Sequence, residues 1–160
     1  MEDTSREFVR DDLRVLVEVA IPGHSAAISP IVDQIMRHVS EGCGASEADH
    51  DHIELALREA LANAVRHGCK NDPNLQVHCT VACDRQGDML IVVRDSGEGF
   101  QPAEVPSPLV GENLFSHHGR GIFLINQLMD EVRFERGGTE IHMVKRVRTG
   151  SRQNGTSADE

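Results

Sequence analysis

Three side chains that could do chemistry recur at four-residue intervals, at Glu59, Asn63 and His67. If this segment is helical, the three stack on one face, so that a carboxylate and an amide point in the same direction. The carboxylate can accept a proton, and the amide oxygen is a hard ligand that suits Mg²⁺. The same spacing is typical of an ordinary solvated polar face, so this segment alone leaves both interpretations open.

The segment around these side chains has the pattern of an amphipathic helix. Ser46-Glu47-Ala48-Asp49 matches a capping box and predicts the helix start, and Gly68 predicts its end. Apolar residues recur at 3.6-residue spacing and form the opposite face: Ile53, Leu57, Leu61, Ala64 and Val65. The helix would therefore hold Glu59 and Asn63 rigidly above a core.

A second candidate segment, Asp95-Ser96-Gly97-Glu98-Gly99-Phe100, follows an apolar strand. An aspartate at a buried strand end can accept a hydrogen bond from an exocyclic amine such as that of adenine, and nearby glycines permit close approach. Alone, the D-x-G-x-G pattern also occurs in plain turns and calcium loops. The strand contains a continuous apolar run, Leu90 to Val93, which predicts a central strand covered on both faces.

Two further glycine segments lie near the C-terminal end. Gly119-Arg120-Gly121-Ile122 marks a change from loop to helix, where free N–H groups and an arginine could bind phosphate, although an ordinary helix start looks the same. Gly138-Thr139-Glu140 opens the last strand. It could contact a ligand, but a hairpin turn with a strand-favouring threonine explains it at least as well.

The remaining pattern predicts an α+β fold with one mostly antiparallel sheet covered by helices on one face. Strands are expected over Leu13–Ile21, Gln76–Cys83, Met89–Asp95, Val132–Glu135 and Glu140–Val147. Helices are expected from the Ser29-Pro30 cap to about Glu41, over the segment that carries Glu59, and over Gly121–Met129. Residues 1–10 are expected to be flexible, residues 11–148 to form one domain, and residues 149–160 to form a disordered tail.

Composition narrows the class of protein. The net charge of −10 disfavours nonspecific binding to nucleic acid or to acidic membranes. No apolar run approaches the roughly 20 residues that span a bilayer, and Met1 is followed by charged residues, so we expect neither a membrane span nor a signal peptide. The four cysteines, Cys43, Cys69, Cys79 and Cys83, lack zinc-site spacing, so they are expected to be reduced thiols of a cytoplasmic protein.

The four segments in this order resemble the nucleotide-site motifs of the Bergerat-fold (GHKL) ATPases, the superfamily of histidine kinases, gyrase and Hsp90. Within it, the chain looks most like the small anti-sigma factor serine/threonine-protein kinases of bacterial partner-switching systems. The resemblance covers about Leu13 to Arg146 and is most specific from Gly119 to Val132. The combination is much more specific than any one motif.

The resemblance implies roles for individual side chains. Glu59 would be the catalytic general base on a partner's serine or threonine hydroxyl, and Asn63 would hold Mg²⁺ between the phosphates of ATP. Asp95 would bind the adenine amine, and Thr139 would support Asp95 and the base through water. For His67 we favour a structural role at the end of the helix.

The glycine-rich segments would complete the nucleotide site. The resemblance implies that Gly97 and Gly99 shape the wall beside adenine. Arg120, with the backbone of Gly119 and Gly121, would face the phosphates. The long connection over residues 101–118 would close over the nucleotide as a lid.

The implied cofactors are ATP and Mg²⁺, and the implied partners are a STAS-type anti-sigma factor antagonist, a sigma factor and a second copy of the chain in a homodimer. Such relatives often carry a basic partner-contacting residue early in the first helix. Here the region Ala26–Ile35 has no Lys or Arg, and the nearest is Arg37. Two alternatives therefore stay open: an ATP-dependent binding module without phosphotransfer, and a phosphotransfer module that controls another target, such as a phosphatase or a cyclase.

Overall fold

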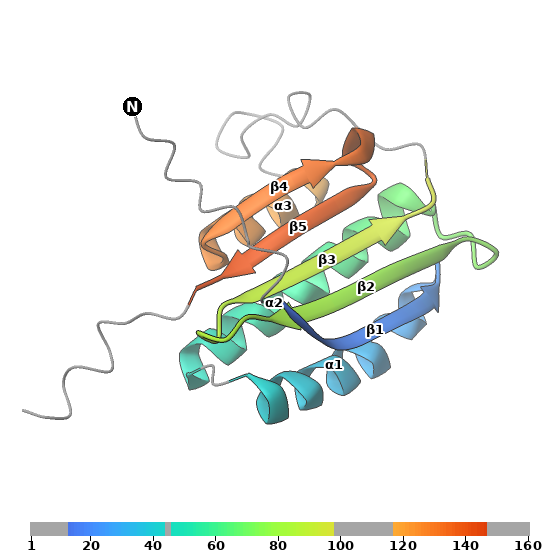
Figure 1. The fold of residues 1–160 in the computed structure, drawn as a ribbon. Coiled ribbons are helices and arrows are strands. Elements are labelled where there is room, and N and C mark those ends of the chain that lie inside the picture. Colours follow the sequence, from blue (N-terminus) through green and yellow to red (C-terminus); the bar gives the residue numbers. More distant parts are fainter. Residues whose placement is uncertain (1–12, 44–45, 98–116, 147–160) are drawn as a thin grey trace, which may run out of the picture.

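The computed structural model describes residues 13–43, 46–97 and 117–146, with the side chains of the last range described from residue 121 onward (Figure 1). Expectations for residues 1–10, for the lid over 101–118 and for the tail over 149–160 lie outside, or almost wholly outside, the described residues. The elements, in chain order, are β1 (Arg14–Pro22), a 3₁₀ turn η2 (Ser25–Ala27), α1 (Ile28–Gly42), α2 (Glu47–Asn63), η3 (Ala64–Gly68), β2 (Gln76–Cys83), β3 (Met89–Asp95), α3 (His117–Leu128), β4 (Glu131–Glu135), a 3₁₀ turn η6 (Arg136–Gly138) and β5 (Glu140–Lys145).

The strands form one five-stranded sheet in the order β1-β2-β3-β5-β4, and every neighbouring pair is antiparallel. The predicted α+β architecture is confirmed. Asp95 is the last residue of the central strand β3 and pairs with Val77 near the start of β2, so it lies at the end of the sheet where β3 ends and β2 begins.

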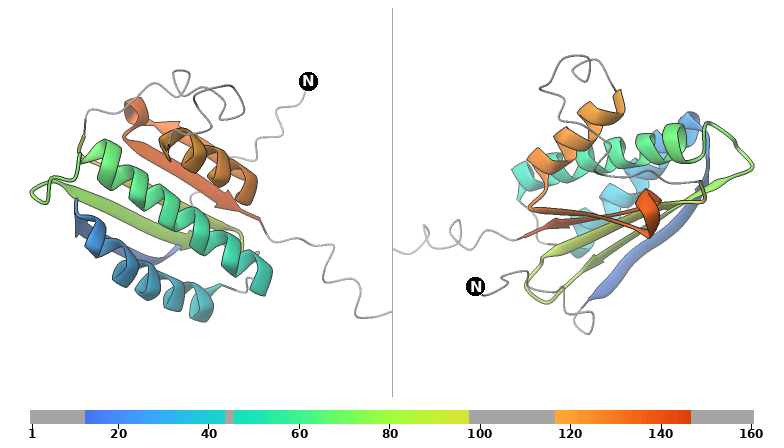
Figure 2. Two further views of the ribbon diagram at one scale, coloured as in Figure 1. Left: turned by 180° about the vertical axis from the view of Figure 1, so that it is seen from behind. Right: turned by 90° about the horizontal axis from the view of Figure 1, so that it is seen from above.

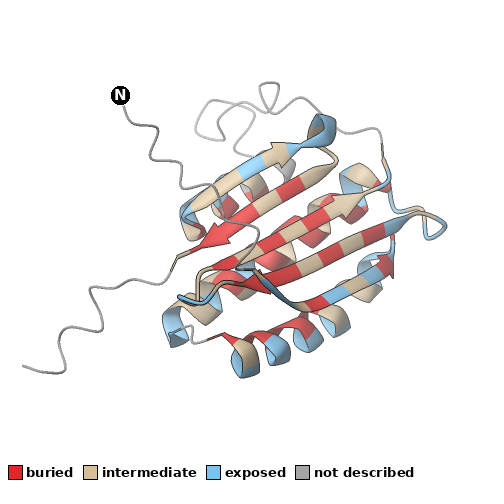
Figure 3. Ribbon diagram, in the orientation of Figure 1, coloured by how far each residue is buried: buried red, intermediate tan, exposed pale blue. Residues whose placement is uncertain are grey.

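All three α-helices lie on one face of this sheet (Figure 2). The helix α2 lies between α1 and α3 and packs against both. Buried residues alternate along the strands (Figure 3). Val81, Ile91 and Met143 are fully buried and belong to the same apolar core as Ile53 and Leu57 of α2. This layer of apolar contacts holds α2 in a fixed position above the sheet.

The continuous apolar run in β3 does not mean that the strand is covered on both faces. Burial alternates along it: Met89, Ile91 and Val93 are buried, whereas Leu90 and Val92 are only half-buried (Figure 3). The prediction of two covered faces is wrong. All the α-helices of the described chain lie on the face that carries Met89, Ile91 and Val93, and none covers the face that carries Leu90 and Val92.

Helix ends agree with the sequence pattern in one case and differ in two. Ser46 caps α2, and its hydroxyl accepts the Asp49 N–H at 3.1 Å, as the capping box predicts. The cap of α1 is Ala27, two residues before the expected Ser29, because the η2 turn leads directly into the helix. The helix α3 begins at His117, one turn before the expected Gly121.

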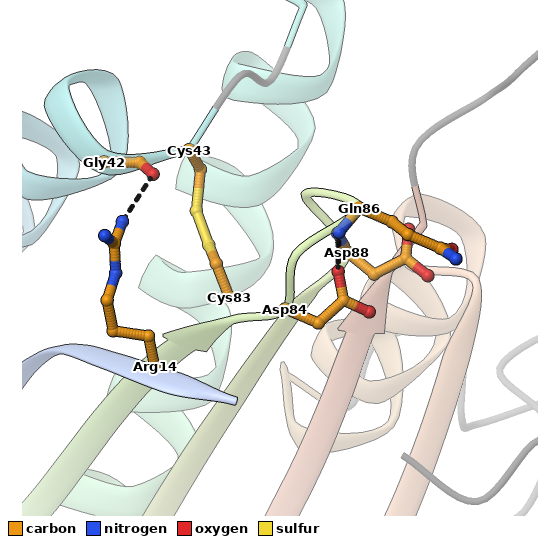
Figure 4. Close-up of a disulfide and its surroundings, with 7 residues drawn as sticks. All are labelled: Arg14, Gly42, Cys43, Cys83, Asp84, Gln86 and Asp88. Atoms are coloured by element: carbon orange, nitrogen blue, oxygen red, sulfur yellow. Dashed lines mark hydrogen bonds between the residues drawn. A yellow bond between two sulfur atoms is a disulfide. The ribbon is translucent and has the colours of Figure 1, made fainter. Parts of the chain in front are cut away.

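Two of the four cysteines are not free thiols, contrary to the expectation. Cys43, which follows α1, and Cys83, which ends β2, form a disulfide with their Cα atoms 6.6 Å apart (Figure 4). Cys69 and Cys79 are free and buried. A spacing of 40 residues carries no local signal of pairing, and only the packing of α1 across the sheet brings these two thiols together.

A buried lysine links β5 to the end of α3 and to the start of α2. Lys145 on β5 is 4% exposed; its Nζ donates to the Leu128 carbonyl at 2.6 Å and lies 3.7 Å from Asp49 Oδ1. The C-terminal end of α3 is thereby held beside the first turn of α2, so the two helices run antiparallel. In the described ranges, every helix is too short or too polar to cross a membrane.

Candidate functional site

A cavity of about 200 Å³ lies between the last turns of α2, the end of the central strand β3 and the start of α3. Apolar and polar groups share its wall, as is typical of small-molecule sites. Its lining residues are Ala60, Asn63, Ala64, His67, Gly68, Val93, Asp95, Ile122, Phe134, Gly138, Thr139 and Ile141. Asn63, Asp95 and Thr139, which come from three separate sequence motifs, therefore share one cavity.

Asp95 is anchored at the end of β3 by backbone hydrogen bonds. Its N–H donates to the Thr139 carbonyl at 2.9 Å, and its Oδ1 accepts the Gly97 N–H at 2.8 Å. Burial raises the pKa of the Asp95 carboxyl, while the Gly97 N–H acts in the opposite direction. The carboxylate is thus fixed on the cavity wall, where it can accept a hydrogen bond from a ligand.

Two glycines make room for this carboxylate. A Cβ atom on Gly68 would collide with the Asp95 carboxyl group, and a Cβ on Gly97 would overlap the carbonyl oxygen of Gly68. A side chain at position 97 would therefore require a backbone shift, and one at position 68 would displace the Asp95 carboxylate. Gly97 thus lies in close contact with the backbone of Gly68, its role beside adenine stays a prediction, and Gly99 lies outside the described residues.

The α2 helix widens into a π-helix, η3, just before the cavity. The Cys69 N–H donates to the Ala64 carbonyl at 2.8 Å, five residues back, in place of the usual four. Segments of this kind are rare and often mark functional sites. Here the wider turn carries His67 and Gly68 onto the cavity wall, so His67 lines the cavity and does not serve only the helix end.

Glu59, Asn63 and Gly121 meet at the junction of α2 and α3. A Cβ atom on Gly121 would lie 2.9 Å from Glu59 Oε2 and 3.1 Å from Asn63 Nδ2. Gly121 is buried there, while both α2 side chains are half-buried. The expected base, the expected magnesium ligand and the expected phosphate-binding glycine are therefore neighbours at one end of the site.

The remaining expected site residues are Gly119, Arg120 and Thr139. Gly119 and Arg120 lie in the first turn of α3, and the Arg120 side chain is outside the described part of the chain. The Thr139 hydroxyl donates to the Arg136 carbonyl at 2.9 Å, so Thr139 touches Asp95 through its backbone carbonyl. This threonine stabilises the turn and the strand end together.

The apolar wall of the cavity was not part of the sequence prediction. Val93 and Ile141 lie on paired strands, Phe134 comes from β4, and Ile122 follows the glycine segment of α3. A flat aromatic base packs well against such side chains. Phe134 is one of only 5 phenylalanines in a chain without Trp or Tyr, which is the one signal that could have singled it out.

These residues fit a magnesium nucleotide. Gly68 and Gly97 let the Asp95 carboxylate and the turn after β3 pack closely together, and Gly121 lets the start of α3 lie against Glu59 and Asn63. The Asn63 amide offers the hard oxygen that Mg²⁺ requires, next to the glycine-rich start of α3. The Asp95 carboxylate lies on the same cavity wall, against the sheet edge.

Comparisons with known proteins agree with this geometry. The family model of the histidine kinase-like ATPase domain matches residues 21–145. The serine-protein kinase RsbW of Staphylococcus epidermidis is 31% identical over 141 residues, which cover 82% of this chain and 87% of the relative. RsbW of Staphylococcus aureus strain MSSA476 is 28% identical over 139 residues, with the same coverage of each chain.

Solved structures share the fold. The RsbU and RsbW domains of a Mycobacterium tuberculosis protein match 81% of this chain and 31% of that chain, with a TM-score of 0.54 and 19% identity. The histidine kinase domain of the blue-light activated histidine kinase EL346 from Erythrobacter litoralis matches 78% of this chain and 61% of that chain, with a TM-score of 0.50 and 22% identity.

Proposed function

Because the chain belongs to the family of histidine kinase-like ATPase domains and resembles the RsbW serine-protein kinases over most of its length, we propose that it is an ATP-dependent protein serine/threonine kinase and anti-sigma factor. In this proposal it phosphorylates a STAS-type antagonist and, when the antagonist is absent, sequesters a sigma factor. It works as a homodimer in the cytoplasm and contacts neither nucleic acid nor membrane.

The observation that carries the proposal is the meeting of Glu59, Asn63 and Gly121 at one end of a cavity whose wall also includes Asp95. A nucleotide-binding module needs the aspartate and the apolar wall. It has no need of a carboxylate beside the phosphate end. The position of Glu59 next to Asn63 therefore favours phosphotransfer over binding alone.

Nucleotide binding follows from the cavity wall. The Asp95 carboxylate accepts a hydrogen bond from the exocyclic amine of adenine. The side chains of Val93, Phe134 and Ile141 pack against the base. His67 lines the same cavity as Asn63 and Asp95. Gly119, Arg120 and Gly121 present the first turn of α3 to the phosphates.

In the proposed phosphotransfer one bond forms, one bond breaks, and three residues of this chain have separate roles. The bond that forms joins the partner's hydroxyl oxygen to the γ-phosphorus, the bond that breaks joins that phosphorus to the β–γ bridging oxygen, and ADP leaves. Glu59 takes the proton of the attacking hydroxyl, and Asn63 would hold Mg²⁺, which would supply charge neutralisation. Arg120 adds positive charge on the phosphate side.

Phosphotransfer from radiolabelled ATP to a purified STAS-type antagonist tests the proposal. Glu59→Gln keeps the size and polarity of the side chain but removes the base, so we expect the rate to fall at least about 100-fold, the low end of what a general base contributes. MgATP affinity should change little. Glu47→Gln, an exposed glutamate at the start of the same helix, is the matched control.

Three results would separate the alternatives. A Glu59→Gln variant with full activity would remove Glu59 as the base. A wild-type chain that binds MgATP and the antagonist yet yields no phosphoprotein would be a binding module. A chain that phosphorylates a captured partner unrelated to sigma-factor control would belong to a different switch.

A further inference from the structure

Three metal-binding side chains gather on the first half of α2, away from the cavity. His50, Asp51 and Glu54 each offer a ligand atom, and these atoms all lie within 4.8 Å of one another. His50 and Glu54 are half-buried, whereas Asp51 is exposed, so the group is open to solvent. His50 precedes Asn63 by 13 residues, which places the cluster roughly 20 Å along the helix from the proposed nucleotide site.

The hydrogen bonds of Ser40 are compatible with one tautomer of His50 in particular. The Ser40 hydroxyl has one proton, and it donates this proton to the Met36 carbonyl at 2.9 Å. The same oxygen lies 3.0 Å from His50 Nε2, and its lone pairs can accept an Nε2–H, so this tautomer satisfies both contacts at once. In this tautomer the lone pair of Nδ1 is available to a metal.

This arrangement is the one that metal-binding histidines use. A ligating imidazole almost always donates its other N–H to a neighbouring oxygen, which sets the orientation of the ring and raises the basicity of the ligating nitrogen. Here the oxygen comes from α1 and the imidazole from α2, so the packing of two helices holds the ring in place. The serine contact is independent of the two carboxylates.

One contact competes with a metal. Arg58, one turn further along α2, has its Nη2 3.2 Å from Glu54 Oε1 and 3.6 Å from Asp33 Oδ1. The pair with Glu54 is a partly exposed i, i+4 ion pair, and such pairs contribute only about 0.3–0.5 kcal/mol. Glu54 also keeps Oε2, and Arg58 retains Asp33 as a partner, so metal binding at Glu54 requires little rearrangement.

We propose that His50, Asp51 and Glu54 form a binding site for a first-row divalent transition metal, with Zn²⁺ as the leading candidate. One imidazole and two carboxylates suit such an ion, and the remaining coordination positions would be open to water. All three ligands lie on about one turn of a single helix, and Ser40 ties that turn to α1. The site is independent of the proposed kinase function.

Calorimetric titration of Zn²⁺ into the full, untagged chain tests the site, without nucleotide and in a buffer free of phosphate. We expect one equivalent to bind, with affinity at least 10-fold weaker for His50→Ala and for Asp51→Asn. Asp51→Asn alters a single exposed carboxylate, so it keeps the test valid if the histidine variant folds poorly. His38→Ala, an exposed histidine on α1, is the matched control and should bind as the wild type does.

A second variant tests the role of the serine. Ser40→Ala removes the acceptor of the Nε2–H, and we expect it to weaken Zn²⁺ binding by about 10-fold, the lower end of the effect of such outer contacts. Wild-type affinity in Ser40→Ala would overturn the assignment of Nδ1 as the ligand. Wild-type affinity in His50→Ala, or loss of binding in His117→Ala/His118→Ala with retention in His50→Ala, would overturn the site itself.

Discussion

Gly121 on α3 lies directly against the carboxylate of Glu59 on α2, so close that a Cβ atom at Gly121 would be 2.9 Å from Oε2. Asn63 lies beside the same Cβ position, with Nδ2 3.1 Å from it. The start of α3 therefore defines where the two polar groups of α2 can point. Small changes at this contact should alter chemistry more than stability.

Gly121→Ala tests that relationship. The new methyl group must displace the flexible end of Glu59, so phosphotransfer to the antagonist should fall at least about 10-fold, in line with the cost of misplacing a catalytic group. The melting temperature should fall by only a few degrees, because the displaced atoms are at the end of a side chain. Gly137→Asn is the control: nothing lies within 4 Å of its Cβ position, and asparagine tolerates its positive φ. Equal activity in Gly121→Ala and wild type would contradict the tight contact.

Nucleotide binding should weaken at acidic pH through Asp95. Burial raises the pKa of this carboxyl, so it becomes protonated at a higher pH than an ordinary aspartate. The protonated group cannot accept a hydrogen bond from the adenine amine through that oxygen. ATP affinity should be full above the raised pKa and should fall as the pH decreases through it.

Inosine triphosphate provides the matched probe for this titration. It carries an oxygen acceptor where ATP carries the amine, so a protonated Asp95 can donate to it. Its affinity relative to ATP should therefore rise as the pH falls, measured by calorimetry at a series of pH values. A constant ratio of the two affinities across that range would show that Asp95 does not contact the exocyclic group.

The disulfide between Cys43 and Cys83 should stabilise the fold by about 3–4 kcal/mol, since it closes a loop of about 40 residues in the unfolded chain. Urea unfolding with and without a phosphine reductant measures this difference. The Cys43→Ala/Cys83→Ala variant should unfold at the same urea concentration under both conditions. A wild-type chain that is insensitive to the reductant would mean that these cysteines are not linked in solution.

Lys145→Met tests the buried contact at the far end of the helix layer. The variant keeps an unbranched side chain that is one heavy atom shorter, but it leaves the Leu128 carbonyl without the lysine donor and removes the cation near Asp49. We expect a loss of about 1–3 kcal/mol in the free energy of unfolding, measured by urea denaturation. Arg37→Met, at an exposed position of α1, should change it by less than about 0.5 kcal/mol. Equal stability of the two variants would contradict a structural role for Lys145.

Local patterns predicted the parts of the site that local physics determines. Glu59 and Asn63 share a face because they are four residues apart on a helix. Asp95 lies at the end of the sheet because it is the last residue of an apolar strand. The Ser46 cap follows from the hydrogen-bonding capacity of its hydroxyl. Each of these predictions depends on one stretch of consecutive residues.

Features that depend on distant contacts could not be predicted in this way. The Cys43–Cys83 bond and the Phe134 side of the cavity exist only because α1, β2 and β4 take particular places in the fold. The π-helical turn at Ala64–Gly68 is also absent from helical periodicity, since it adds one residue to a turn without changing the apolar pattern. Gly68 predicted a helix end, but its close approach to Asp95 becomes visible only in three dimensions.

The central claim is that the cavity around Asp95 binds MgATP, and calorimetry on the wild type and on Asp95→Asn tests it most directly. Asparagine is nearly isosteric, but its amide would present N–H groups to the adenine amine or lose the charge of the acceptor. Asp33→Asn, an exposed carboxylate on α1, is the matched control. We expect MgATP to bind the wild type and Asp33→Asn with equal affinity, and Asp95→Asn at least about 10-fold more weakly, since a hydrogen bond to a charged group is worth about 1.5–3 kcal/mol. Equal binding to all three proteins, or no binding to the wild type, would contradict the claim.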